Sequence, residues 1–251
     1  GRVYGRVVYD LPQLDRTSRG KAIVNLIELK QGERVNACVS VKSFEKGFLT
    51  MATERGLVKK TELAAYANVR PSGIIAIALE ERDRLIGVSV TTGENEVILG
   101  TAEGMSIRFP EGDLRSMGRD TYGVAGIRLD EGDRVVDMIL PVPDGTILTA
   151  CENGFGKRSP LDDHRLQSRA GKGIINIKAT ERNGKVVGMK EVRDDDDLLM
   201  ITQGGIIVRI PVREIRSMGR NTQGVRLIRL DEGDKLVAIA RVEYEEIEAE
   251  A

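Results

Sequence analysis

Residues 114–134 read LRSMGRDTYGVAGIRLDEGDR, and residues 215–235 read IRSMGRNTQGVRLIRLDEGDK. Most positions match at an offset of 101 residues, which is two units of roughly fifty. The unit between them is present too, because Gly154 and Gly173 repeat the glycine spacing found on either side. Self-similarity at this period is the signature of a repeat architecture.

Each unit predicts four short β-strands, except that the first unit lacks its opening strand. An apolar strand such as 48–53 precedes the first glycine, and a strand with a basic residue near its end, such as 105–108, follows it. The second glycine opens a third strand, as at 174–177, and a polar turn leads to a fourth, as at 135–140. Glycine permits the tight reversals that this pattern needs.

A four-stranded unit of this length cannot bury both faces alone, so the copies must pack on one another. Closed radial packing also protects the strand edges. We therefore expect an all-β, propeller-like ring over residues 1–242 and a disordered acidic tail at 243–251. Its five expected blades cover about 1–43, 46–92, 95–142, 145–193 and 196–242.

The composition favours a soluble, folded, cytoplasmic protein. Apolar residues make up 41% and charged residues 31% of the 251 residues. Cys38 and Cys151 form no CxxC pair and fit buried thiols in a reducing compartment. No signal peptide is visible, and the apolar runs are too short to span a membrane.

Charge is sorted by position within the repeat, although the net charge is only −1. The windows 1–21, 55–73, 103–123, 153–173 and 204–224 together hold 21 basic and 10 acidic residues, against 17 and 29 elsewhere. In a ring of equivalent units this bias becomes a basic band, which suits the phosphates of a bent duplex. Only the third window is acidic, and solvated turns are the alternative explanation for a single repeat.

The expected mode of DNA recognition is indirect. Aromatic residues make up only 4% of the chain, which argues against base stacking on single strands. No helix-turn-helix or zinc-finger pattern is present. Binding would depend on phosphate contacts, counterion release and DNA bending.

The repeats resemble the C-terminal domain of the DNA gyrase A protein. The resemblance is carried by 1–4 (GRVY), by 16–26 (RTSRGKAIVNL) and by the shared segments at 115–133 and 216–234. It implies a β-pinwheel, a ring of about six blades that exchange strands, of which five are visible here. The basic glycine-rich box typical of gyrase is absent, and 167–173 (QSRAGKG) is a partial match.

The resemblance also implies a function and partners. It implies that duplex DNA wraps around the perimeter, in support of ATP-dependent negative supercoiling by a parent gyrase. That enzyme would use ATP and Mg, combine the gyrase A and gyrase B proteins in an A2B2 heterotetramer, and act at the nucleoid. No cofactor, metal or membrane contact is expected for this chain itself. A topoisomerase IV-type domain and a propeller that binds proteins are the alternatives.

The expected DNA contacts are basic residues of the phased windows. They are Arg16, Arg19, Lys21, Lys59, Lys60, Arg70, Arg108, Arg115, Arg119, Lys157, Arg158, Arg165, Arg169, Lys172, Arg209, Arg213, Arg216 and Arg220.

No residue pattern predicts catalysis in this chain. His164 is the single histidine, and a turn position beside Asp162 and Asp163 explains it better than a catalytic role. The carboxylate run 194–197 lacks the alternating ligands of a calcium loop and is expected to be a solvated turn. The spacing around Gly171 does not match a phosphate-binding loop.

Overall fold

The computed structural model describes residues 1–14 and 18–243, which form short strands and a few short 3-10 helices. The strands are β1 (Arg2–Val3), β2 (Phe48–Thr53), β3 (Leu57–Glu62), β4 (Ile74–Ile75), β5 (Leu85–Thr91), β6 (Glu96–Thr101), β7 (Met105–Pro110), β8 (Val124–Ala125), β9 (Val135–Ile139), β10 (Thr146–Cys151), β11 (Phe155–Pro160), β12 (Ile174–Ile175), β13 (Val186–Val192), β14 (Asp197–Thr202), β15 (Ile207–Pro211), β16 (Val225–Arg226) and β17 (Leu236–Val242). The 3-10 helices are η1 (Val8–Asp10), η2 (Ile23–Asn25), η3 (Leu63–Tyr66), η4 (Glu111–Asp113), η5 (Leu161–Asp163) and η6 (Val212–Glu214).

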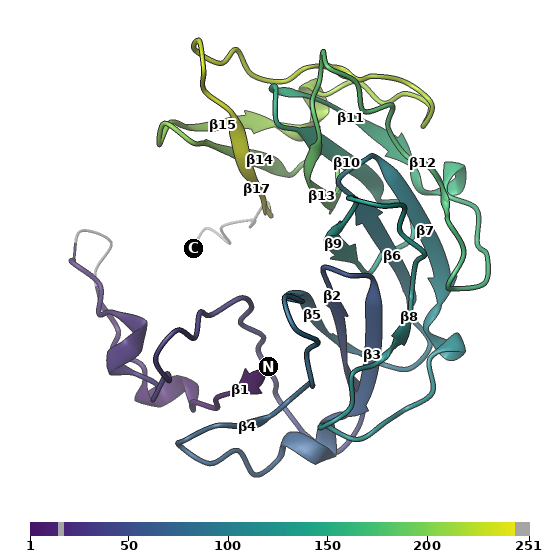
Figure 1. Ribbon diagram of the computed structural model, residues 1–251. Helices are drawn as coiled ribbons and strands as arrows, with labels where there is room; N and C mark the ends of the chain where they lie inside the picture. The colour runs from purple at the N-terminus through teal and green to yellow at the C-terminus, as the bar shows by residue number, and fades with distance from the viewer. Residues whose placement is uncertain (15–17, 244–251) are drawn as a thin grey trace, which may run out of the picture.

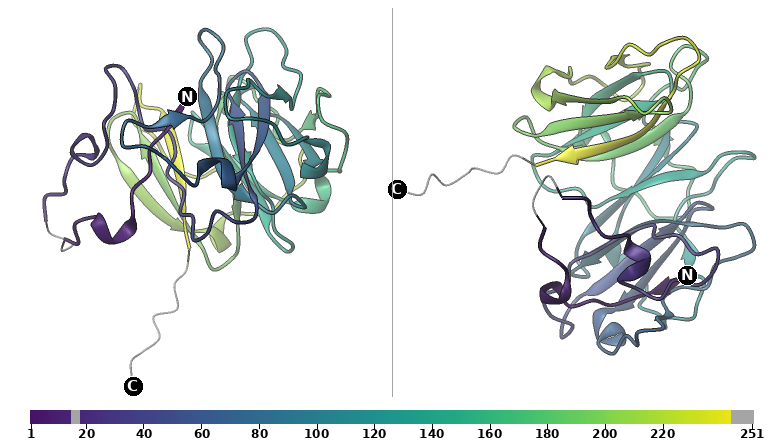
Figure 2. Two further views of the ribbon diagram at one scale, coloured as in Figure 1. Left: turned by 90° about the horizontal axis from the view of Figure 1, so that it is seen from below. Right: turned by 90° about the vertical axis from the view of Figure 1, so that its left-hand side faces the viewer.

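The sheets are arranged radially around a central axis (Figure 1). Three sheets have four antiparallel strands, in the orders β5-β2-β3-β8, β9-β6-β7-β12 and β13-β10-β11-β16. A fourth sheet, β17-β14-β15, has three strands, and β1 pairs with β4. Strands β5, β9, β13 and β17 lie nearest the axis, and the short strands β4, β8 and β12 lie farther out (Figure 1). Figure 2 shows the same sheets side-on.

Neighbouring units exchange strands, as the resemblance implies. The outermost strand of each four-stranded sheet comes from the next unit along the chain: β8 pairs with β3, β12 with β7 and β16 with β11. The hydrophobic clusters lie between successive sheets. One cluster joins Val58 of β3 with Leu99 of β6 and Ile107 of β7. Burial therefore requires neighbouring blades, and the all-β pinwheel predicted from the sequence is confirmed.

In the third and fourth units, the two glycines stand where one unit's backbone closely approaches another's. Gly123 begins the exchanged segment with φ +108°, and a Cβ there would lie 2.7 Å from the carbonyl oxygen of Val58. Gly104 has φ +85°, and its Cβ would lie 2.3 Å from the carbonyl oxygen of Ile177. A side chain at either position would separate the exchanged strand from its host sheet.

The first unit, expected to lack only its opening strand, also lacks two of its later strands in the described residues. Beyond β1, its described residues form turns and two 3-10 helices. Ile23 and Val24 match the exchanged strand in sequence, yet they lie in η2 and are exposed. No host sheet edge lies beside them among the described residues. Residues 35–41 form no strand either, so Cys38 is exposed, contrary to the expected buried thiol.

The last sheet has an uncovered outer edge in the described part of the chain. No exchanged strand pairs with β15 there, and Ile207 is 64% exposed. The acidic tail predicted at 243–251 falls almost wholly on 244–251, which lie outside the described residues. Within 1–14 and 18–243, none of the helices has the length and apolar character needed to cross a bilayer.

Candidate nucleic-acid interface

Each exchanged strand belongs to a longer crossing segment, and these segments form the rim. We define the crossing segments as residues 64–78, 115–128, 165–178 and 216–229. Each of the last three runs along the outer edge of the preceding sheet. Ser116 bridges to Lys60, Leu166 to Arg108 and Ser217 to Arg158, in parallel.

Backbone hydrogen bonds join the crossing segments to one another. The amide of Ala78 donates to the carbonyl of Thr121 at 3.1 Å. The amide of Arg128 donates to Gly171 at 2.8 Å, and that of Lys178 to Thr222 at 2.9 Å. The rim is therefore continuous from the second unit to the fifth.

The crossing segments are strongly basic. Together they hold twelve Arg or Lys residues and one acidic residue, Asp120. Because the whole chain has a net charge of −1, the remainder carries −12. Within one molecule the positive charge is concentrated on the rim, which suits a curved polyanion.

Eight of the expected contact residues lie on the crossing segments. Five are exposed and three are half-buried. The three half-buried arginines are equivalent and donate to carbonyl oxygens of the exchanged strands: Arg119 to Ile75 (3.4 Å), Arg169 to Ala125 (2.9 Å) and Arg220 to Ile175 (2.6 Å). The exposed group comprises Arg70, Arg115, Arg165, Lys172 and Arg216.

Four of the expected contacts are buried, and this corrects their assignment as DNA contacts. The side chains of Lys59 and Lys157 are completely buried. Lys60 and Arg158 are 6% and 7% exposed. All four lie on β3 or β11, the strands that follow the first glycine of their units. The crossing segment of the next unit covers them, so no phosphate can reach them.

Lys59 and Lys157 instead hold the crossing segments in place. The Lys59 ammonium donates to the carbonyls of Ala76 (2.8 Å) and Arg119 (2.5 Å). The Lys157 ammonium donates to Gly219 (2.7 Å) and Arg220 (2.6 Å). Burial disfavours the charged form and lowers the pKa of each lysine to about 8.

The lowered pKa values of Lys59 and Lys157 predict that the free energy of unfolding rises with pH. Between pH 8 and the unfolded pKa of 10.5, the unfolded chain binds more protons than the folded chain, so folding gains free energy as pH increases. The expected gain from pH 7 to pH 9 is about 1 kcal/mol per lysine. Urea unfolding at both pH values measures it, and the double variant K59M/K157M should lack this gain.

Comparing the pH dependence of stability in the native chain and in K59M/K157M cancels an opposing contribution from Cys151. Burial raises the pKa of Cys151 to about 12, so the folded chain keeps a thiol proton that the unfolded chain loses, and stability falls as pH rises. Both chains contain Cys151. Parallel pH dependence in the two chains would contradict the assignment to the lysines.

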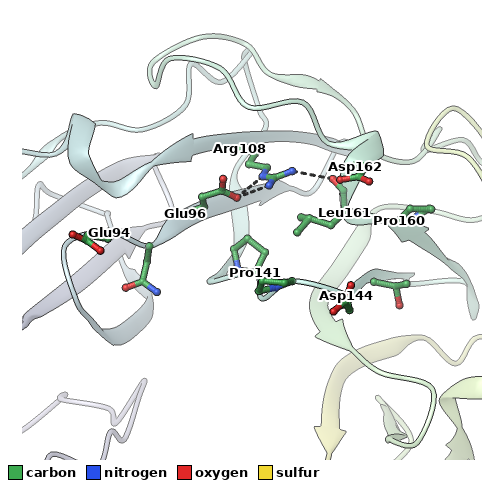
Figure 3. A pocket seen from close by; sticks show the side chains of 12 residues that line it. Glu94, Glu96, Arg108, Pro141, Asp144, Pro160, Leu161 and Asp162 are labelled. Atoms are coloured by element: carbon green, nitrogen blue, oxygen red, sulfur yellow. Dashed lines mark hydrogen bonds and ion pairs between the residues drawn. The ribbon is translucent and has the colours of Figure 1, made fainter.

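Arg108 lies in a pocket rather than on the open rim. Its guanidinium pairs with Glu96 at 2.6 Å and donates to the carbonyl of Leu161 (Figure 3). It also donates to the carbonyl of His164 at 3.0 Å. The pocket has a volume of about 720 Å³, and Glu94, Asp144 and Asp162 also line it. This acidic lining opposes phosphate binding, so Arg108 is less suited to contact DNA than the exposed arginines of the crossing segments.

The remaining expected residues lie off the crossing segments. Arg209 is exposed on β15 and pairs with Asp197 at 2.6 Å. Arg213 is exposed in η6, and Arg19 and Lys21 are exposed before η2. Arg16 lies outside the described residues.

The sequence windows missed four exposed basic residues of the rim. Arg128, Lys178 and Arg229 each follow the exchanged strand of their unit, and Arg226 lies on β16. The guanidinium of Arg226 lies 5.3 Å from the centroid of the Phe155 ring. The windows ended at the second glycine. Alignment of the repeats beyond that glycine shows three of these basic positions directly.

The rejected chemical motifs have structural roles. His164 is buried and lies 3.2 Å from the Ser106 hydroxyl, and burial lowers its pKa to about 4, so it is neutral. The run 194–197 begins as the expected exposed turn at Asp194 and Asp195, and Asp194 pairs with Arg158. Asp196 departs from that expectation, because it is buried and pairs with Arg241 at 2.7 Å. Among the described residues, no three His, Cys, Asp or Glu side chains could hold a metal together.

Comparison with the profiles of known protein families shows to which family the chain belongs. The profile of the DNA gyrase C-terminal domain, described as a beta-propeller, matches residues 2–42, 48–92, 95–141, 146–193 and 196–243. The chain belongs to the DNA gyrase C-terminal domain family. The strand exchange and the basic crossing segments are therefore features of a member of this family.

Gyrase A proteins of two bacteria share this similarity. The DNA gyrase A protein of Halalkalibacterium halodurans is 54% identical over 249 residues, which cover 99% of this chain and 30% of that protein. The DNA gyrase A protein of Escherichia coli is 51% identical over 243 residues, covering 96% of this chain and 28% of that protein. The chain therefore spans about 30% of the length of these relatives.

Solved structures of the family have the same fold. The C-terminal domain of DNA topoisomerase IV superposes with a TM-score of 0.87 at 29% identity, over 94% of this chain and 74% of that one. A DNA gyrase A C-terminal domain superposes with a TM-score of 0.84 at 24% identity, over 97% and 80%.

Proposed function

We propose that this chain binds duplex DNA along its crossing segments and bends it around the blades, as a non-catalytic domain of a gyrase A protein. The observation that carries the proposal is the continuous rim, with twelve basic residues and one acidic residue in a chain of net charge −1. Phosphates along a bent duplex would find cations at each successive blade.

Arginine is suited to this role because its planar guanidinium can bind a phosphate with two hydrogen bonds. Smooth bending of a short site costs on the order of 1–6 kcal/mol, which several such contacts offset. Recognition would be largely independent of base sequence, since no helix or β-ribbon positioned for groove entry contributes to the rim of the described chain.

The wider setting is part of the same proposal. The parent protein would be a cytoplasmic, nucleoid-associated type II topoisomerase that combines gyrase A and gyrase B proteins as A2B2, and it would use ATP and Mg for negative supercoiling. The match to the DNA gyrase C-terminal domain profile and the identities of 54% and 51% to two gyrase A proteins support gyrase over topoisomerase IV.

Salt dependence tests the proposal. With about six phosphate contacts, each doubling of salt concentration should lower the affinity for duplex DNA about fortyfold. Fluorescence anisotropy of an end-labelled duplex measures this affinity. Energy transfer between dyes at the two ends should increase on binding if the duplex bends. An affinity that stays constant as salt increases would exclude the proposed rim contacts.

A further inference from the structure

The exchanged strands expose aliphatic side chains at the periphery. Ile75 of β4 is 47% exposed and Ile175 of β12 is 40% exposed. Ala125 occupies the equivalent position on β8 and is also exposed. These residues lie on the outermost strand of their sheets (Figure 1). Natural edge strands usually carry charges where they meet solvent, so a recurring apolar position there requires an explanation.

A rim arginine accompanies each of these side chains. The carbonyl oxygens of Ile75, Ala125 and Ile175 each accept a hydrogen bond from Nη1 of the arginine of the next unit. These arginines are Arg119, Arg169 and Arg220. The bond fixes the guanidinium beside the aliphatic residue and leaves further N–H groups for a phosphate. A cation and an apolar group are therefore paired on three successive blades.

We propose that Ile75 and Ile175 pack against deoxyribose rings of the DNA strand whose phosphates the neighbouring arginines bind. The inference rests on the proposed function and adds a second, uncharged type of contact to it. Phosphate and deoxyribose alternate along each DNA strand. A guanidinium beside a branched aliphatic side chain is complementary to that alternation, because the C–H surface of the sugar is apolar.

The contact differs from blade to blade. Ala125 offers a single methyl group between two blades that carry isoleucine, so its contact with the sugar is smaller. On the next blade Arg226 replaces the aliphatic residue and stacks on Phe155. The apolar contribution is therefore concentrated at Ile75 and Ile175.

The double variant I75A/I175A tests the inference against the native chain. Each substitution should lower the affinity for duplex DNA about threefold, since it removes aliphatic surface that binding would bury. The double variant should therefore bind about tenfold more weakly at every salt concentration. The slope of affinity against salt should stay unchanged, because no charge is removed.

Ala125→Ile provides the converse test. It adds aliphatic surface at the equivalent exposed position and should tighten binding about threefold. The control is V90A/V237A. Val90 on β5 and Val237 on β17 are 40% and 49% exposed but lie on the axial strands, away from the rim. This control should bind DNA like the native chain.

The outcomes separate this inference from the proposed function. Native binding that falls steeply with salt, combined with unchanged affinity in a folded I75A/I175A, would overturn the sugar contact alone. If the native chain does not bind duplex DNA, both the proposed function and the sugar contact are overturned. Thermal melting shows whether I75A/I175A is folded. If it is unfolded, the DNA affinity of A125I tests the inference instead, and an A125I affinity equal to that of the native chain overturns it.

Discussion

Replacing Arg115, Arg165 and Arg216 together with glutamate is expected to weaken duplex binding about a thousandfold at low salt. The three arginines occupy equivalent exposed positions at the start of three crossing segments. Each reversal removes one phosphate contact and adds a repulsive charge, and each should therefore cost about tenfold. The salt slope should decrease by about three, one for each lost contact. Anisotropy titrations over a range of salt concentrations measure both quantities.

A matched variant separates local contacts from net charge. R34E/R82E/R193E changes the net charge by the same amount at exposed positions outside the crossing segments. Its loss of affinity should be far smaller and its salt slope close to native, because these residues lie off the crossing segments. Equal losses in the two triple variants would mean that overall charge, rather than the rim, governs binding.

Glu111→Ala is expected to destabilise the fold by about 3 kcal/mol. The Glu111 carboxylate is completely buried and accepts hydrogen bonds from the Thr50 and Thr91 hydroxyls. It also accepts from the amides of Gly93 and Asn95 at 3.0 and 3.3 Å. Alanine leaves these buried donors without an acceptor, and each unsatisfied donor costs about 1–3 kcal/mol before the structure relaxes or water enters.

Urea unfolding measures the effect of Glu111→Ala, and Glu94→Ala is its control. Glu94 is an exposed carboxylate in the adjoining turn, so its removal should change stability by less than about 0.5 kcal/mol. The destabilisation caused by Glu111→Gln should lie between those of Glu111→Ala and Glu94→Ala, since an amide oxygen can still accept some of the hydrogen bonds. A cost for Glu111→Ala as small as that for Glu94→Ala would show that the buried network does not contribute.

The repeat and its glycines could be predicted from sequence because they follow from local geometry. Gly104 and Gly123 stand where two backbones nearly touch, and no other residue fits without displacement. The family resemblance added strand exchange. Sequence alone did not reveal which outer strand is covered by which crossing segment, because that depends on contacts between residues about sixty positions apart.

This missing information explains the errors at Lys59 and Lys157. On an uncovered strand their side chains would be exposed, whereas the crossing segment encloses them. One signal was present in the repeats: the equivalent positions are Ile107 and Val208, both aliphatic. Aliphatic residues at a repeated position indicate an interior site. The predictions of further strands in the first unit and of a buried Cys38 were wrong for the converse reason. No neighbouring sheet encloses residues 23–24 or 35–41 in the described structure.

Strand exchange also has a consequence for synthesis on the ribosome. A chain that emerges from its N-terminus forms β2 and β3 well before residues 124–125 are available to cover them. Each sheet is completed only after most of the following repeat has been translated. The nascent domain therefore carries an unpaired strand edge at its growing end as each repeat is made, and in the described chain β15 keeps that edge after the last repeat.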